Sequence, residues 1–236
     1  MSTLSAPRSR PRSSELSLLE NGDRMKQPEF HRRYLAYPEE VKFELIGGIV
    51  YMASPLRWPH GLYHIQLAGL FFLYTAATPG TQSGDNTTVI LGEESEPQPD
   101  LVLRILAERG GHSRENQEEY LEGPPELIAE IAYSSRAIDL HQKKEDYQKA
   151  GVLEYLVLSV ESQELYWFSF ETADLLKPNR KGVYGSRVFP GLWINGPALL
   201  AQDSSQLAAT VQEGIRSRGH TQFVKRLQAA RRKGSQ

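Results

Sequence analysis

Two acids and a lysine pair near the middle of the chain have the types and the spacing for metal-assisted hydrolysis. Asp100 stands at the start of the apolar run LVLRI, and Glu130 lies inside a second run, LIAEIAY. A lysine pair, Lys143 and Lys144, follows on an amphipathic segment. Carboxylates on neighbouring buried strands repel each other unless a cation lies between them, and an all-oxygen ligand set suits Mg²⁺ or Mn²⁺. A nearby ammonium would orient an attacking water, so this arrangement predicts metal-dependent cleavage of a phosphodiester bond.

The elements that position these residues can be predicted from sequence periodicity. LVLRI and LIAEIAY are short, rich in β-branched residues and bounded by proline or glycine, which predicts buried strands. FELIGGIVYM predicts a hairpin about Gly47–Gly48, SGDNTTVILG one strand entered through a turn, LEYLVLSV and ELYWFSF two more strands, and NRKGVYGSRVFPGLWI a last hairpin. Helices are expected from Pro59 onward and from Asp139, as N-cap, to Gly151. These segments predict an α/β fold with a central mixed sheet, the long helix on one face and the Asp139 helix on the other.

Seven segments resemble, in the same order, the Uma-two family, which is described as putative restriction endonucleases within the PD-(D/E)XK nuclease superfamily. They are FELIGGIVYMASP, HGLYHIQLAGL, ATPGTQSGDNTTVIL, EPQPD, GPPELIAEIAYSS, DLHQKKEDYQKAGVLEYLVL and VFPGLW. Each segment alone is weakly specific, but the ordered set extends over residues 20–193 and is strongly specific. The resemblance implies a restriction-endonuclease-like core and a Mg²⁺-dependent endonuclease, for which Mn²⁺ can substitute, acting on DNA phosphodiesters.

The resemblance also implies roles for individual residues. Asp100 and Glu130 would bind the metal, together with the backbone carbonyl of Ile131, and Lys143 would orient the attacking water or stabilise charge on the phosphate. The usual superfamily signature places its lysine two residues after the second acid, where this chain has Ala132. In the Uma-two pattern the lysine lies on the following helix instead, where DLHQKK occurs.

The choice between the two lysines is open on helical geometry alone. Lys143 and Lys144 flank the apolar stripe Leu140–Tyr147 about equally. The register of the resemblance favours Lys143, and Lys144 remains the alternative.

Two further residues are candidates for support of the site. The resemblance places Glu44 near the active site, where it would complete an acidic cluster; the alternative is a solvent-exposed glutamate on an edge strand. His60 matches a recurring histidine that would contact phosphate or support the acids; the alternative is a polar residue in the first helical turn. His60 and His64 have a zinc-binding i, i+4 spacing, but neither the HExxH glutamate nor a third ligand is evident, which disfavours zinc.

The remaining sequence bounds the class of protein. The formal net charge of −2 argues against nucleic-acid binding driven mainly by net charge. The chain has no cysteine, which excludes disulfides and thiolate metal sites. No apolar stretch is long enough to cross a bilayer, so we expect no membrane partner and a cytoplasmic protein. Since the two strands of a DNA duplex offer two-fold related targets, we also expect a homodimer.

Three regions are expected along the chain. Residues 1–19 are rich in serine, proline and arginine and predict a disordered basic arm. Residues 20–200 would form the nuclease domain, and residues 201–236 a helical extension with a basic end. In the long helix that begins at Pro59, we expect the apolar face to include Leu62, Ile65 and Phe72.

Two other functions stay open at this point. A nuclease fold can serve as a non-catalytic nucleic-acid-binding or regulatory module, because a fold does not by itself confer chemistry. The retention of Asp100, Glu130 and Lys143 argues against that alternative. A metal-dependent hydrolase of another substrate would use the same three residues, and only the resemblance disfavours it.

Overall fold

A computed structural model describes residues 18–38, 40–133 and 135–233 of the protein. The helices are α1 (Gln27–Tyr34), α2 (Trp58–Ala77), η1 (Ala107–Arg109), α3 (Arg136–Ile138), η2 (Asp139–Lys143), α4 (Lys144–Ala150), α5 (Gly196–Leu200), α6 (Ser204–Ile215) and α7 (Arg218–Lys233). The strands are β1 (Phe43–Ile46), β2 (Ile49–Met52), β3 (Thr81–Asp85), β4 (Val89–Ile90), β5 (Leu101–Ile105), β6 (Arg114–Glu115), β7 (Leu121–Glu122), β8 (Leu127–Ala132), β9 (Glu154–Ser159), β10 (Glu164–Ser169), β11 (Asp174–Leu175), β12 (Val183–Gly185) and β13 (Trp193–Asn195). Of the predicted basic arm, residues 1–17 lie outside the described part.

A six-stranded mixed sheet forms the centre of the protein. Its order is β11-β10-β9-β8-β5-β3, in which β8 and β9 run parallel and the other neighbours antiparallel. The two predicted catalytic strands, β5 and β8, are neighbours in this sheet. The central mixed sheet and the α/β class are therefore confirmed. SGDNTTVILG, predicted as one strand, instead contributes to β3 and to β4, and β4 belongs to a separate small sheet of order β4-β7-β6.

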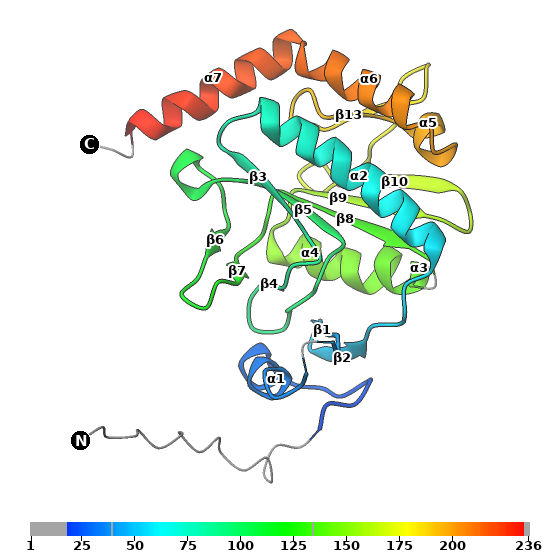
Figure 1. Ribbon diagram of the computed structural model, residues 1–236. Coiled ribbons are helices and arrows are strands. Elements are labelled where there is room, and N and C mark those ends of the chain that lie inside the picture. The colour runs from blue at the N-terminus through cyan, green and yellow to red at the C-terminus, as the bar shows by residue number, and fades with distance from the viewer. Residues whose placement is uncertain (1–17, 39, 134, 234–236) are drawn as a thin grey trace, which may run out of the picture.

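Helices cover both faces of the sheet, as Figure 1 shows. Successive side chains of a strand point to opposite faces, so each strand contributes to two apolar clusters. One cluster packs α2 and the C-terminal helices against the sheet; its strand residues include Leu101, Leu103, Leu127, Ala129, Leu156 and Leu158. The other packs α4 against the opposite face, through Val102, Ile128, Tyr147, Tyr155 and Val157. The predicted placement of the two helices is confirmed.

The buried face of α2 differs from the prediction. Ile65 and Phe72 are 66% and 68% exposed, and Leu62 is only partly buried. The buried stripe follows the i, i+3, i+4 pattern through His60, Tyr63, Leu67, Leu70, Phe71 and Tyr74. Because α2 is apolar on nearly all sides, its sequence does not distinguish one stripe from the next. Two tyrosines lie in the core instead of Ile65 and Phe72, and each keeps a partner for its hydroxyl: Tyr63 donates to Leu200 O and Tyr74 to Pro190 O.

The helical segment that carries the lysine pair begins earlier than predicted. Its first residue is Arg136, with Ser135 at the N-cap position, so the prediction of Asp139 as N-cap is wrong. Asp139 instead begins η2, a π-type turn that is continuous with α3 and α4. The predicted end is confirmed, since Gly151 terminates α4 with a left-handed φ of 95°. Such π-type turns are frequent at functional sites.

Two smaller parts flank the sheet. The predicted β1–β2 hairpin is present, and its two glycines adopt positive φ of 56° and 76°. This hairpin packs with α1 in a cluster that includes Leu19, Phe30 and Phe43. At the other end, α6 and α7 contribute buried leucine, valine and phenylalanine residues to the same core as α2. The boundaries drawn at residues 20 and 200 stay predictions. None of the helices in the described part has the length and apolar character of a membrane-spanning segment.

Candidate active site

The register of β5 and β8 places the two predicted acids side by side. Leu101 pairs with Ala129 in this antiparallel ladder, so the preceding residue, Asp100, lies opposite Glu130. The Asp100 amide is 3.3 Å from Glu130 Oε2, and the Ile131 amide donates to Asp100 Oδ2 at 2.7 Å. Asp100 and Glu130 are 9% and 4% exposed. Two buried carboxylates therefore meet at one edge of the sheet, where like charges directly opposite each other repel.

Lys143, the last residue of η2, reaches these acids from the face of the sheet that α4 covers. Its Nζ lies 3.0 Å from Glu130 Oε1, 3.0 Å from Glu44 Oε1 and 3.8 Å from Asp139 Oδ1. The lysine side chain is 8% exposed. It is therefore the central cation of an acid cluster formed by Asp100, Glu130, Glu44 and Asp139.

The neighbouring lysine points elsewhere. Lys144 Nζ lies 4.9 Å from the ring centroid of Phe168, a residue of β10. The structure therefore brings Lys143, and not Lys144, to the acids. The catalytic role of Lys143 stays a prediction.

Both supporting candidates lie in the site. Glu44, on β1, is 15% exposed at its side chain and accepts a hydrogen bond of 2.8 Å from the Gln98 amide, in addition to the bond from Lys143. It is not a solvent-exposed edge residue. His60, in the first turn of α2, places Nε2 3.1 Å and 3.2 Å from the two carboxylate oxygens of Asp100. The second histidine, His64, lies 3.0 Å from Asp100 O through its own Nε2.

The structure adds two residues that the sequence analysis did not assign to the site. Tyr147 donates to Glu130 Oε1 at 2.8 Å, and Asp139 accepts from Ser135 Oγ at 2.5 Å while its other oxygen faces Lys143. Asp139, Lys143 and Tyr147 recur every four residues, so they share one face of the helical segment. This four-residue spacing is the sequence signal that could have assigned Asp139 and Tyr147 to the site. The sequence analysis instead interpreted Asp139 as an N-cap and Tyr147 as part of an apolar stripe.

The central pair of charges is strongly perturbed by its surroundings. Burial raises the pKa of Glu130 well above its usual value, although the Lys143 ammonium opposes the rise. The nearby carboxylates of Asp100, Asp139 and Glu44 raise it further. For Lys143, burial lowers the pKa, but the surrounding carboxylates outweigh burial and hold it well above its usual value. Lys143 is therefore a permanent cation near neutral pH.

The two flanking acids behave differently from each other. Burial alone would raise the pKa of Asp100, but the hydrogen bond and charge of His60, helped by the Ile131 amide, bring it below its usual value. Burial raises the pKa of Asp139 to about 6, against the Lys143 charge and the Ser135 hydrogen bond. Asp100 is thus ionised at neutral pH, and the cluster holds more carboxylates than cations.

The acids open into a cleft of about 360 Å³ that Glu44, His60, Ile131 and Lys143 also line. Within residues 18–38, 40–133 and 135–233, no group of three or more histidine, cysteine, aspartate or glutamate side chains is arranged to hold a metal ion. Mg²⁺, however, commonly binds through one or two carboxylates and keeps several waters. The Ile131 amide points toward Asp100. Because the N–H and C=O of one strand residue point to the same side of the strand, the Ile131 carbonyl also points toward β5. Two carboxylates, this carbonyl and the excess negative charge fit that ion.

Known proteins resemble this chain in fold and in sequence pattern. The structure is similar to a solved structure described as a "putative nuclease belonging to DUF820" from Anabaena variabilis, with a TM-score of 0.58 and 11% sequence identity. The match covers 72% of this chain and 97% of that one. At this identity it shows a shared fold. Among curated proteins, none matches the chain significantly. Residues 28–198 match the Uma2 family, described as "Putative restriction endonuclease", and since this is most of the chain, the protein belongs to that family.

Proposed function

We propose that the protein is a Mg²⁺-dependent endonuclease that hydrolyses DNA phosphodiester bonds. One observation carries the proposal: Asp100 and Glu130 lie opposite each other on adjacent strands, and the Lys143 ammonium is 3.0 Å from Glu130 in an open cleft. Membership of the Uma2 family supports the same reaction class.

Asp100, Glu130 and the Ile131 carbonyl would hold the metal. Bound there, Mg²⁺ or Mn²⁺ supplies Lewis-acid activation of a phosphoryl oxygen and of a bound water. The protein keeps these ligands in place through second contacts. His60 holds the Asp100 carboxylate, and Tyr147 holds the Glu130 carboxylate through a hydrogen bond of 2.8 Å.

Lys143 acts as a fixed positive charge. A lysine whose pKa lies well above its usual value keeps its proton, so it does not serve as the general base. Its ammonium donates hydrogen bonds and stabilises the negative charge that develops on the phosphate. Glu44 and Asp139 orient it from two sides, at 3.0 Å and 3.8 Å. Both roles that the resemblance implies for this lysine, orientation of the attacking water and charge stabilisation, are compatible with a protonated side chain.

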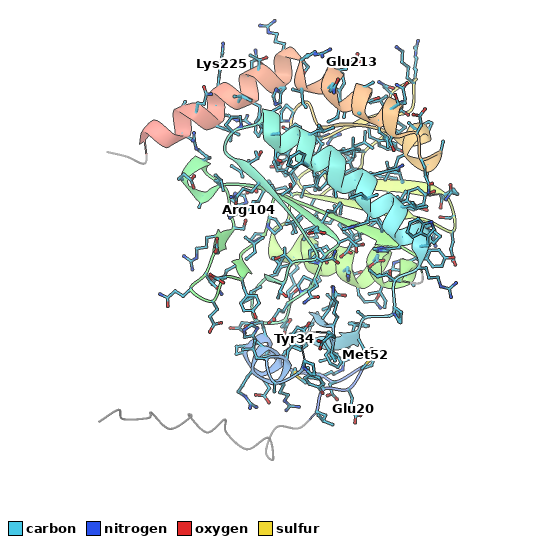
Figure 2. The ribbon with its side chains drawn as sticks, viewed as in Figure 1. Glu20, Tyr34, Met52, Arg104, Glu213 and Lys225 are labelled. Atoms are coloured by element: carbon cyan, nitrogen blue, oxygen red, sulfur yellow. The ribbon has the colours of Figure 1, made fainter. Side chains whose placement is uncertain are left out.

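The test is cleavage of supercoiled plasmid and of single-stranded DNA with Mg²⁺, with Mn²⁺ or with EDTA. We expect nicked or linear products with either metal and none with EDTA or with Glu130→Gln. The matched control is Glu213→Gln, an exposed residue that points outward from α6 (Figure 2). DNA binding that does not depend on metal, without cleavage under any condition, would instead assign the fold to a non-catalytic nucleic-acid-binding module.

The proposed partners are DNA, a divalent metal and a second copy of the chain. The homodimer follows from the two-fold symmetry of duplex DNA alone. Light scattering of the purified protein, with and without a short duplex, measures it directly. If the protein is a monomer that makes only single-strand nicks, the prediction of a homodimer is wrong, but the proposed reaction still holds.

A further inference from the structure

The segment Met52–Trp58, which joins β2 to α2, exposes large apolar side chains to solvent. All of its residues are exposed, and Met52, Leu56 and Trp58 are 54%, 66% and 79% exposed. Figure 2 labels Met52 at the end of the hairpin, from which the chain continues to α2. Three large apolar side chains exposed within one short segment make this segment a candidate contact site for another molecule.

This segment borders the acid cleft. Residues 52–57 line the cleft together with Asp100 and Glu130, and Trp58 follows at the first position of α2. Two residues after Trp58, His60 contacts the Asp100 carboxylate. A ligand that contacts residues 52–57 within the cleft would therefore lie beside the predicted catalytic acids.

The segment is attached to the site at both ends. At its start, the Ala53 amide donates to Lys42 O at 3.0 Å. At its end, the Arg57 guanidinium lies 5.3 Å from the ring centroid of Tyr133, which follows β8 directly. Lys42 and Arg57 also line the cleft. The exposed apolar side chains thus stand beside two cations that can contact phosphate.

We propose that the segment Met52–Trp58 binds an unstacked base of single-stranded nucleic acid, next to the phosphodiester that lies at the acids. The inference rests on the proposed function for the position of that phosphodiester. Trp58 would stack on the base, and Met52 and Leu56 would contact its edge and sugar. In a paired duplex the base faces are closed by stacking, whereas an unpaired or extruded base offers its face to an aromatic ring.

Two cations, Lys42 and Arg57, and an exposed aromatic ring beside an otherwise acidic cleft favour this occupant. Proteins that bind single strands without sequence preference join a positively charged groove to aromatic side chains on which bases stack. Duplex binding through phosphates alone would require Lys42 and Arg57 but not an exposed tryptophan. We therefore infer a substrate with an unpaired stretch at the cleavage site, such as a single strand, a flap or a bulge.

The experiment measures affinity without catalysis. Fluorescence anisotropy in EDTA compares a labelled oligothymidine of about 20 nucleotides, longer than one typical binding site, with its duplex. The variants are Trp58→Ala and Trp58→Phe, which restores a ring. The matched control is Phe72→Ala, because Phe72 is 68% exposed on the same helix, about 21 Å along its axis.

We expect Trp58→Ala to weaken single-strand binding about tenfold, the effect of losing one stacked base, and duplex binding by much less. Trp58→Phe should recover most of the loss, and Phe72→Ala should bind like the parent. Raising the salt concentration should weaken parent and Trp58→Ala in parallel, because stacking releases no counterions. Unchanged single-strand affinity in Trp58→Ala, or an equal loss in Phe72→Ala or on the duplex, would overturn the inference.

The outcomes separate this inference from the proposed reaction. If the protein never cleaves DNA but loses single-strand affinity in Trp58→Ala, the inferred surface stands and the hydrolysis fails. If it cleaves DNA, and Trp58→Ala cleaves and binds like the parent, the reaction stands and the surface fails. A change of oligomeric state in Trp58→Ala with unchanged DNA affinity would assign the segment to contacts between copies and also overturn the inference.

Discussion

Two buried glutamates on neighbouring parallel strands are compensated in opposite ways. Glu154 begins β9 and is 0% exposed. Burial raises its pKa, and hydrogen bonds from neutral donors oppose the rise. The donors are Trp167 Nε1, Ser186 Oγ and the backbone amides of Arg187 and Val188, at 3.1, 2.7, 2.7 and 3.2 Å. Each carboxylate oxygen accepts two hydrogen bonds, so Glu154 joins the sheet to the loop before β13, and the described part of the chain provides it with no counter-ion.

Glu130, on β8, stands in a different environment. Its partners are the Lys143 ammonium at 3.0 Å and the Tyr147 hydroxyl at 2.8 Å, with the Asp100 amide farther away at 3.3 Å. Three other carboxylates surround the same ammonium or lie opposite Glu130 on the next strand. This end of the sheet therefore carries more carboxylates than cations, and the cleft opens it to solvent.

The difference separates a structural acid from a candidate catalytic acid. Fixed dipoles compensate Glu154, so the fold alone satisfies it and no ligand is needed. Around Glu130 the fold holds several carboxylates close to a single ammonium. This arrangement lowers the stability of the fold unless a bound ligand compensates the remaining negative charge. Burial alone does not distinguish the two residues, because both are buried and both have a raised pKa.

The largest effect is expected when the acid cluster loses its cation. Lys143→Met keeps much of the side-chain length and removes the charge, so the cleavage rate should fall by a factor of about 10² to 10³. Mg²⁺ affinity should hold or rise, because a neighbouring cation opposes metal binding. Single-turnover cleavage with metal titration measures both quantities.

The matched control is Lys144→Met, since the Lys144 ammonium lies over the Phe168 ring on β10. Its rate should stay within a few-fold of the parent. Equal rates for the parent and Lys143→Met would remove Lys143 from the mechanism. A selective loss in Lys144→Met would transfer the role to that residue.

A pair of isosteric substitutions tests the comparison directly. Glu154→Gln turns an amide group toward hydrogen-bond donors and should lower the free energy of unfolding by about 3 kcal/mol, with or without Mg²⁺. Glu130→Gln removes a carboxyl group whose ionised form is disfavoured by burial and by its neighbours, and it leaves Lys143 its contacts to Glu44 and Asp139. Its metal-free stability should therefore change by less than about 1 kcal/mol.

The second half of this prediction concerns the metal. The stabilisation that Mg²⁺ gives the parent should be lost in Glu130→Gln and kept in Glu154→Gln. Urea unfolding with Mg²⁺ and with EDTA provides all four values. A large metal-free loss in Glu130→Gln would mean that Glu130, like Glu154, is held for structural reasons.

Much of the fold could be predicted from the sequence because local patterns determine it. β5, β8, β9 and β10 are short apolar runs between turn residues, and the Gly47–Gly48 hairpin needs positive φ at both positions. Asp100 and Glu130 were recognisable because a carboxylate at or inside such a run requires a partner. The stripe of α2 was mispredicted because that helix is apolar on nearly all sides.

Other features depend on tertiary structure that no local pattern encodes. The register that sets Asp100 opposite Glu130 follows from pairing between strands far apart in sequence. The contacts that distinguish Lys143 from Lys144 come from other elements, Glu44 on β1 and Glu130 on β8. Glu154 gave no signal either, because all its donors come from β10 and the loop before β13.

The last prediction concerns the pH dependence of stability and isolates one acid of the cluster. Burial raises the pKa of Asp139 to about 6, whereas an unfolded aspartate titrates near its ordinary value of about 3.9. Between these values the folded state holds a proton that the unfolded state has released. The contribution of Asp139 to stability is therefore fully present below about pH 4 and is lost as the pH rises through about 6, a change of up to about 3 kcal/mol.

Asp139→Asn should remove this dependence while keeping an acceptor for Ser135. In EDTA, the free energy of unfolding of the variant relative to that of the parent should increase between pH 4 and pH 7. Mg²⁺ should make this increase smaller, because it neutralises the remaining acids. Asp203→Asn, which keeps an N-cap acceptor at the start of α6, is the control on an exposed carboxylate. A constant stability difference across this pH range would show that Asp139 is already ionised at acidic pH. The Lys143 ammonium would then balance more of the cluster than its geometry suggests, and the contrast with Glu154 would be correspondingly weaker.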